Sequence, residues 1–149
     1  MDKKRLFRIM AKAERGVILA LAEKISRSYA VVVVKEPSKT LAMIKLREPV
    51  KSGLFYIGEV IVTEAVVELA GTKGIAVNMG DDFEKTLGMA VIDAACNKGI
   101  FADEPALLAL EAEQLAYAEK ENAMHLKTMV NFNSMDGEAP KDVGFYQKA

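Results

Sequence analysis

Residues 54–69 read LFYIGEVIVTEAVVEL, and this stretch decides the fold. Val, Ile, Phe and Tyr dominate it, and β-branched and aromatic side chains are typical of strands. The stretch is long for one strand, and Gly58 indicates a β-bulge within it, because glycine inside a strand often marks a bulge. The sequence therefore predicts one long strand with an irregularity at Gly58.

Further strand patterns flank this stretch on both sides. Residues 29–34 are rich in Val, and residues 40–47 alternate side chains between two faces. Residues 75–79 alternate again after the segment 71–74 (GTKG), which is typical of a hairpin connection. Because parallel strands need crossovers of a dozen or more residues, these short links predict an antiparallel meander of four strands.

Helical patterns precede and follow the strands. Apolar residues recur at spacings of three and four over residues 6–21, which predicts one N-terminal amphipathic helix. The segment 80–82 (GDD) opens a second helix that Gly99 ends, and the segment 103–105 (DEP) opens a third that runs to about residue 124.

The predicted fold class is therefore α+β. It consists of an N-terminal helix, a four-stranded, mainly antiparallel sheet and two C-terminal helices. Gly, Pro, Asp and Lys recur without period after residue 130, which predicts a mobile tail. We expect one domain over residues 1–130 and a flexible C-terminal tail over residues 131–149.

Composition limits the function classes. The chain has 149 residues, of which 51% are hydrophobic and 28% charged, as is typical of a globular domain. A net charge of −1 argues against nucleic-acid and membrane partners, and the single cysteine favours a cytoplasmic protein. Charge is uneven, with +5 over residues 1–27 and −5 over residues 101–125. These segments either meet within the fold or steer a partner.

Reactive side chains are sparse. The sequence contains neither a Walker phosphate loop nor a dinucleotide-binding glycine motif. Cys96 is the only cysteine and His125 the only histidine, and these two side chains cannot form a zinc site without further ligands. We therefore expect neither a catalytic residue nor a bound metal. Cys96 is interpreted as a small buried hydrophobe and His125 as a surface or interface residue. The GDD segment is compatible with a magnesium site, but a helix cap is favoured.

Polar groups within apolar stretches need an explanation. Glu59 and Thr63 share a strand face with Ile61, because strand residues two apart point the same way. A carboxylate on that face needs a partner, which leaves an ion pair, a subunit contact and a ligand contact as alternatives. Asp93 lies among apolar residues of the second predicted helix, which predicts a buried hydrogen bond.

Several motifs carry a family resemblance. Residues 55–65 (FYIGEVIVTEA) resemble the signature of the PhnG family of the phosphonate carbon–phosphorus lyase system. The likeness continues at residues 80–82 (GDD) and 90–95 (AVIDAA) and returns at residues 128–130 (TMV), covering about residues 5–130. The candidates for a subunit interface or pocket are Gly58, Glu59, Thr63, Gly80, Asp81, Asp93 and Thr128.

The resemblance implies a role in phosphonate catabolism. It implies that the chain acts with PhnH and PhnI in transferring the ribose triphosphate of ATP to a phosphonate with release of adenine. That activity is alpha-D-ribose 1-methylphosphonate 5-triphosphate synthase, and a PhnJ-like subunit then cleaves the product. ATP and the phosphonate are thus substrates of the complex, no cofactor is expected on this chain alone, and the isolated chain is expected to be inactive.

A second interpretation belongs to a different class. It is a non-catalytic scaffold or binding module that recruits partners through its sheet edge and its basic first helix. Self-association of the isolated chain also stays open.

Overall fold

A computed structural model describes residues 1–130 of the chain. These residues form two compact units, residues 1–114 and the described part of residues 115–149, each taken by itself below. The predicted α+β class is confirmed. The predicted mobile tail lies outside the described residues, and the domain boundary at residue 130 stays a prediction. The elements are α1 (Lys3–Lys12), α2 (Arg15–Ser28), β1 (Val31–Arg47), β2 (Leu54–Leu69), β3 (Thr72–Met79), α3 (Phe83–Lys98) and α4 (Glu104–Lys127).

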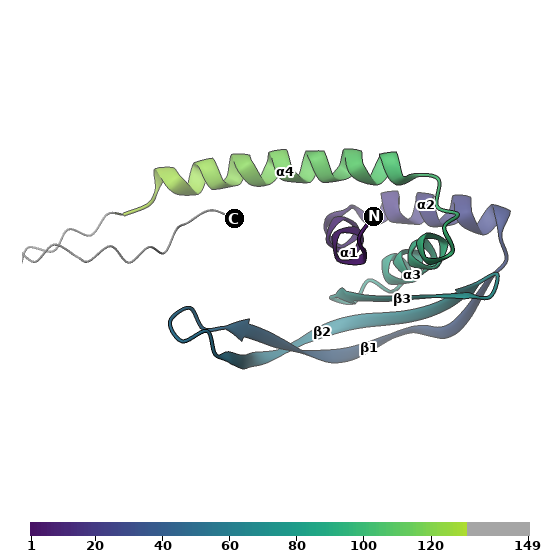
Figure 1. The fold of residues 1–149 in the computed structure, drawn as a ribbon, viewed down its shortest axis with the longest axis horizontal. Helices are drawn as coiled ribbons and strands as arrows, with labels where there is room; N and C mark the ends of the chain where they lie inside the picture. The colour runs from purple at the N-terminus through teal and green to yellow at the C-terminus, as the bar shows by residue number, and fades with distance from the viewer. Residues whose placement is uncertain (131–149) are drawn as a thin grey trace, which may run out of the picture. The chain divides into compact units, whose positions relative to one another are not determined.

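The described sheet has three antiparallel strands in the order β1-β2-β3, not the predicted four (Figure 1). β1 runs through Pro37 as one strand, with register shifts between Val33 and Lys35 and between Lys35 and Ser38. Because β1 is an edge strand, a proline and bulges are tolerated there without breaking the sheet. The two short strands predicted before the long one are therefore halves of a single strand.

The irregularity expected at Gly58 is present. Gly58 pairs with Ile44, whereas the next pair along joins Tyr56 to Lys45, so that Ile57 has no opposite residue. An extra residue on one strand is the definition of a β-bulge. The long predicted strand and its bulge are confirmed.

The predicted N-terminal helix is two helices, α1 and α2. The backbone between them is extended at Ala13 and Glu14. The buried Nζ of Lys85 donates to the carbonyl oxygens of Ala11 and Ala13 at 2.8 and 2.7 Å. These hydrogen bonds satisfy backbone carbonyl oxygens near the end of α1 and so stabilise the break between the two helices. The helical periodicity of residues 6–21 does not reveal this break, because Lys85 lies far along the chain.

α3 lies between the sheet and α2 (Figure 1), and it packs against β2, β3 and α2. Asp82 caps its start by accepting a hydrogen bond from the backbone N–H of Lys85 at 3.0 Å, and Gly99 ends it with a φ of 77°. The predicted helix cap, the helix stop and the turn before β3 are thus confirmed. The largest fully buried core side chains include Ile9, Met10, Ile18, Leu69, Met89, Ile92 and Leu107.

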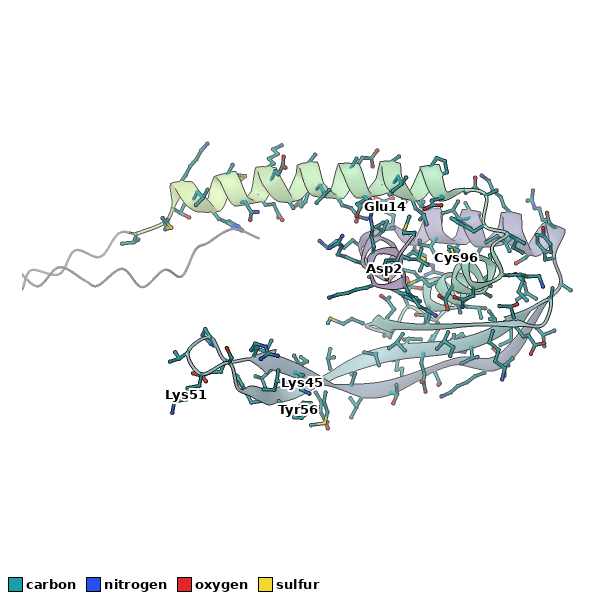
Figure 2. The ribbon with its side chains drawn as sticks, in the orientation of Figure 1. Asp2, Glu14, Lys45, Lys51, Tyr56 and Cys96 are labelled. Carbon is teal, nitrogen blue, oxygen red and sulfur yellow. The ribbon has the colours of Figure 1, made fainter. Side chains whose placement is uncertain are left out.

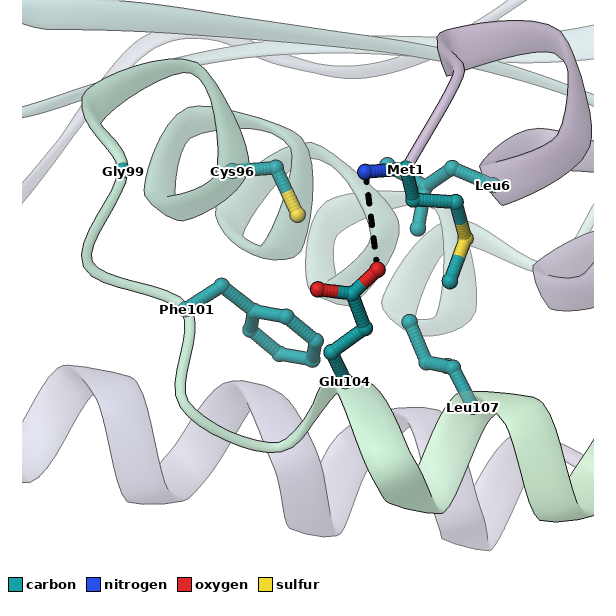
Figure 3. Close-up of a pocket in the computed structure, with 7 residues that line it drawn as sticks. All are labelled: Met1, Leu6, Cys96, Gly99, Phe101, Glu104 and Leu107. Atoms are coloured by element: carbon teal, nitrogen blue, oxygen red, sulfur yellow. Dashed lines mark ion pairs between the residues drawn. The ribbon is translucent and has the colours of Figure 1, made fainter.

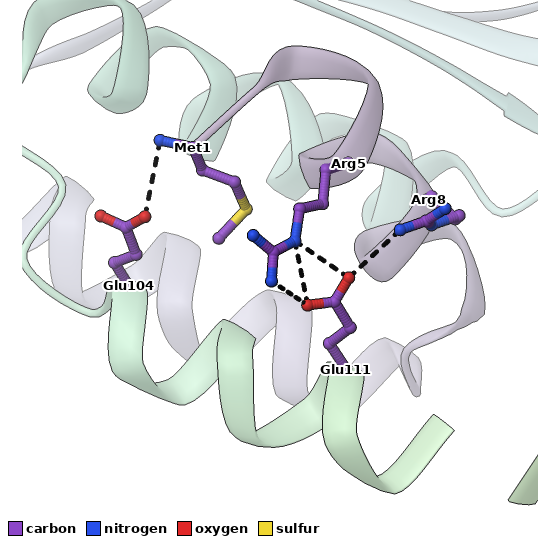
Figure 4. A network of polar contacts seen from close by, with 5 residues as sticks. All are labelled: Met1, Arg5, Arg8, Glu104 and Glu111. Atoms are coloured by element: carbon purple, nitrogen blue, oxygen red, sulfur yellow. Dashed lines mark hydrogen bonds and ion pairs between the residues drawn. The ribbon is translucent and has the colours of Figure 1, made fainter. Parts of the chain in front are cut away.

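The oppositely charged segments meet within the first unit. Arg5 and Arg8 both bond the Glu111 carboxylate, with 3.0 Å from Arg5 Nε to Oε1 (Figure 4). Lys24 pairs with Asp103 at 3.3 Å, and the Met1 ammonium lies 3.5 Å from Glu104. Part of the basic N-terminal charge is therefore used to hold the start of α4.

The ion pairs of Glu111 make the stability of the folded chain depend on pH in the acid range. The hydrogen bond from Arg5 is the main cause that lowers the pKa of Glu111 in the folded protein. Its contribution to stability is therefore full above the unfolded glutamate pKa of about 4.3 and is lost as pH falls further. Thermal unfolding from pH 7 to pH 3 should show a steeper acid loss of Tm in the wild type than in Glu111→Gln. Parallel curves would contradict this role.

Candidate functional site

The hairpin formed by β1 and β2 extends beyond the rest of the sheet (Figure 1). Met79, the last residue of β3, pairs with Val62, so residues 54–61 of β2 pair only with β1. We call residues 39–61 the arm. None of its side chains is buried on either face of the two-stranded ribbon.

Apolar side chains cover much of the arm. The following residues have exposed fractions from 45% to 77%: Leu41, Met43, Leu46, Val50, Leu54, Phe55, Tyr56, Ile57 and Ile61. A two-stranded ribbon is at best marginally stable in water by itself. Exposed apolar clusters of this kind mark interaction surfaces in soluble proteins. The arm is therefore the candidate functional site.

The arm also carries a basic end. Lys45 lies 5.6 Å from the centre of the Tyr56 ring, and Lys51 lies in the loop at the tip (Figure 2). Arg47 donates to the carbonyl oxygen of Ser52 at 2.8 Å. Across residues 39–61, four Lys or Arg and two Glu give a net charge of +2. The surface is thus both apolar and cationic.

Two of the predicted site residues link β2 to the turn before α3. The hydroxyl of buried Thr63 donates to the carbonyl oxygen of Gly80 at 2.8 Å. The backbone N–H of Gly80 donates to the carbonyl oxygen of Ile61 at 2.9 Å, and its φ of 94° favours glycine. These contacts hold the base of the arm against the helical layer.

The remaining exposed candidates divide between the two units. Gly58 and Glu59 lie on the arm, and Glu59 faces Met43 across the ribbon. Asp81 forms an ion pair with Lys39 at 3.3 Å, at the base of the arm. Thr128 lies in the second unit, where its hydroxyl donates to the backbone carbonyl of His125 at 2.9 Å. Their roles at an interface stay predictions.

Asp93 is buried and linked to three other residues. Its Oδ2 accepts from the backbone N–H of Ile75 at 3.0 Å and from Asn97 at 3.2 Å, and it pairs with Lys3 at 3.1 Å. Asn97 also donates to the carbonyl oxygen of Lys73 at 3.0 Å. The predicted buried hydrogen bond is confirmed. Asp93 and Asn97 together cover part of the open edge of β3, a role that the sequence did not predict.

The arm itself was missed as a site in the sequence. The available signal was the mismatch in length between the long strand, residues 54–69, and the strand predicted over residues 75–79. A short neighbour leaves half of a long strand without a pairing partner on that side. Strand periodicity does not reveal whether a helix covers the remaining half.

Comparison with protein families decides the classification. The model of the family described as phosphonate metabolism protein PhnG matches residues 1–137. The chain belongs to the PhnG family. A search of curated proteins found no match. The PhnG match includes every described helix and strand as well as the arm, so the protein is a member of a phosphonate metabolism family.

Metal sites and membrane-spanning helices are two further features that a sequence of this PhnG family could contain within the described residues. Within residues 1–130, no group of three or more His, Cys, Asp and Glu side chains is placed to hold a metal ion. No helix among these residues combines the length and apolar character needed to cross a membrane.

A cavity of about 250 Å³ lies in the first unit beside α3 (Figure 3). Its lining is mixed, with Cys96 and Glu104 beside apolar side chains. Burial is the main cause that raises the pKa of Cys96, to about 11. The thiol therefore stays protonated near neutral pH. Cys96 packs against the core as predicted, but its side chain is half-buried rather than buried. The lining residues are Met1, Leu6, Cys96, Gly99, Phe101, Glu104 and Leu107.

The raised pKa predicts slow thiol chemistry. At pH 8 the thiolate fraction of Cys96 should be about a hundredfold below that of an ordinary cysteine, because each pKa unit changes it tenfold. Alkylation by iodoacetamide, followed by mass spectrometry, should be correspondingly slow and should reach the free-cysteine rate in denaturant. Equal rates in the folded and denatured chain would contradict this prediction.

Proposed function

We propose that this chain is a subunit of the carbon–phosphorus lyase core complex. In this proposal it takes part, with PhnH- and PhnI-like subunits, in transferring the ribose triphosphate of ATP to a phosphonate with release of adenine. A PhnJ-like subunit acts on the product. Since ATP is a substrate of the complex, we place the reaction in the cytoplasm. The family match over residues 1–137 carries this proposal.

The chemistry of the reaction supports a shared site. Displacement at the ribose anomeric carbon needs an acid for the leaving base, donors for an oxocarbenium-like state and cations for the triphosphate. In the described chain, Asp93 is buried and its Oδ2 is bonded within the fold, Cys96 is held as a thiol, and Arg5 is paired with Glu111. We therefore infer that partner subunits supply most of the reacting groups, while this chain supplies binding surface.

The scaffold interpretation has less support. The basic stripe of α1 is partly used internally, since Lys3 pairs with Asp93 and both Arg5 and Arg8 pair with Glu111. The open edge of β3 is partly covered by side chains of α3. These contacts reduce what α1 and the β3 edge offer to a partner, whereas the free edge of β1 runs along the arm, which favours the arm as the contact surface.

Reconstitution tests the proposal. The chain is co-expressed with PhnH- and PhnI-like subunits from a phosphonate operon, and adenine release is followed by chromatography with ATP and methylphosphonate as substrates. We expect a complex that contains this chain, and adenine release only when the chain is included. An equal rate without this chain, or no association with either subunit, would refute the proposal.

A further inference from the structure

We propose that the arm inserts into an apolar cleft of a partner protein, and that the end of this cleft that receives the tip is acidic. This inference rests on the proposed function, because the partner is one of the other subunits. It goes further by naming the surface of this chain that is inserted and the chemistry of the partner surface that receives it.

The distribution of apolar side chains requires a partner that encloses the ribbon. Leu41 pairs in register with Ile61, and these side chains are 60% and 53% exposed. Leu46 pairs with Phe55, and both are 45% exposed. Leu41 and Leu46 lie five residues apart on β1, so they point to opposite faces of the arm. The extra residue at the β2 bulge keeps Ile61 and Phe55 in register with them, although these two lie six residues apart. A flat partner would cover only one pair, whereas a cleft covers both.

The charged side chains of the arm indicate the charge of the cleft that receives them. Lys45, Arg47 and Lys51 lie at or next to the tip. The one carboxylate in that region, Glu48, accepts a hydrogen bond from the backbone N–H of Lys51. Glu59 lies nearer the base, and it forms no ion pair with the described residues. Complementary charge therefore places acidic groups opposite the tip.

Two other classes of partner fit less well. A membrane that received the arm tip-first would hold Lys45 and Lys51 at its greatest depth, where charged side chains are costly. Nucleic acid would neutralise the cations, but aliphatic side chains such as Leu41 and Ile61 gain little from a phosphate backbone. A protein cleft accommodates both the apolar faces and the charged tip.

Two pairs of matched variants test the inference in the co-expressed complex. Leu41→Ser with Ile61→Ser removes apolar contact on the arm, and Ile75→Ser with Val77→Ser removes similarly exposed side chains elsewhere on the sheet. Lys45→Glu with Lys51→Glu reverses two positive charges at the tip of the arm. Lys4→Glu with Lys12→Glu reverses the charges of two exposed lysines of α1.

We expect each arm variant to weaken the Kd of the purified chain for the PhnH- and PhnI-like subunits at least about tenfold, and each control to stay within about twofold. Because the changed residues are exposed, all four isolated chains should unfold at similar temperatures. Backbone amides of the arm should exchange hydrogen more slowly in the complex than in the free chain.

The outcomes separate this inference from the proposed function. A stable complex whose arm amides exchange as in the free chain would refute insertion and leave the proposed function standing. Failure of the wild type to form any complex would refute both. Binding of the free chain to anionic vesicles or to RNA, abolished by the tip reversal, would also overturn the inference. So would a homodimer that Leu41→Ser with Ile61→Ser dissociates.

Discussion

Replacing Gly74 by alanine should lower the free energy of unfolding by about 3 kcal/mol, near the upper end of the usual cost of overpacking. Gly74 lies in β3 directly beneath α3. A Cβ at this position would lie 2.5 Å from the backbone nitrogen of Ala94 and 2.7 Å from its Cβ, and closer still to the carbonyl oxygen of Ala90. Relief requires moving α3 away from the sheet, because backbone atoms cannot rotate aside. Urea unfolding followed by circular dichroism measures the change.

Gly58→Ala is the matched control. Gly58 also lies in a strand, but a Cβ built there has no neighbour within 4 Å. Its substitution should change the free energy of unfolding by less than about 1 kcal/mol, since the added methyl group meets open space. Equal losses for the two variants would mean that α3 does not pack on β3 as closely as described.

Asp93→Ala should be similarly damaging, at about 3 kcal/mol, because hydrogen bonds to charged groups are among the stronger ones and their buried partners stay unsatisfied. Asp93 is 1% exposed and bonds the backbone N–H of Ile75. Its loss leaves that N–H without an acceptor and uncovers part of the β3 edge. The variant should therefore also self-associate more readily, because an open edge strand can pair with another chain.

Lys3→Ala separates the ion pair from the edge contact. Lys3 is more than half exposed, so its pair with Asp93 should contribute less than about 1 kcal/mol. Chemical unfolding and analytical ultracentrifugation of both variants give stability and association state. If Lys3→Ala costs as much as Asp93→Ala, the ion pair rather than the edge contact is the main role of Asp93.

Local patterns predicted most elements of the fold. The long strand, its bulge, the cap at Asp82 and the stop at Gly99 all depend on near neighbours in the chain. The sequence missed what depends on distant residues. Pro37 predicts a strand end unless the strand is known to lie at an edge. At the break after α1, a backbone carbonyl oxygen accepts a hydrogen bond from Lys85, which lies far along the chain.

The family signature divides into two physical roles. Thr63 is buried and bonded to Gly80, so it serves the fold. Gly58 lies beside the β-bulge, and Glu59 lies exposed on the arm, where its carboxylate forms no ion pair with the described residues. Sequence alone could not separate these roles, because strand periodicity gives the face of a residue but not the length of the helix layer above it.

In the proposed complex this chain contributes binding surface rather than reacting groups. The most direct test titrates wild-type chain and the Leu41→Ser/Ile61→Ser variant into fixed amounts of the PhnH- and PhnI-like subunits while adenine release is measured. We expect the variant to need a higher concentration for the half-maximal rate but to reach the wild-type plateau. A lower plateau at saturating variant would contradict it, because the arm would then take part in the chemistry itself.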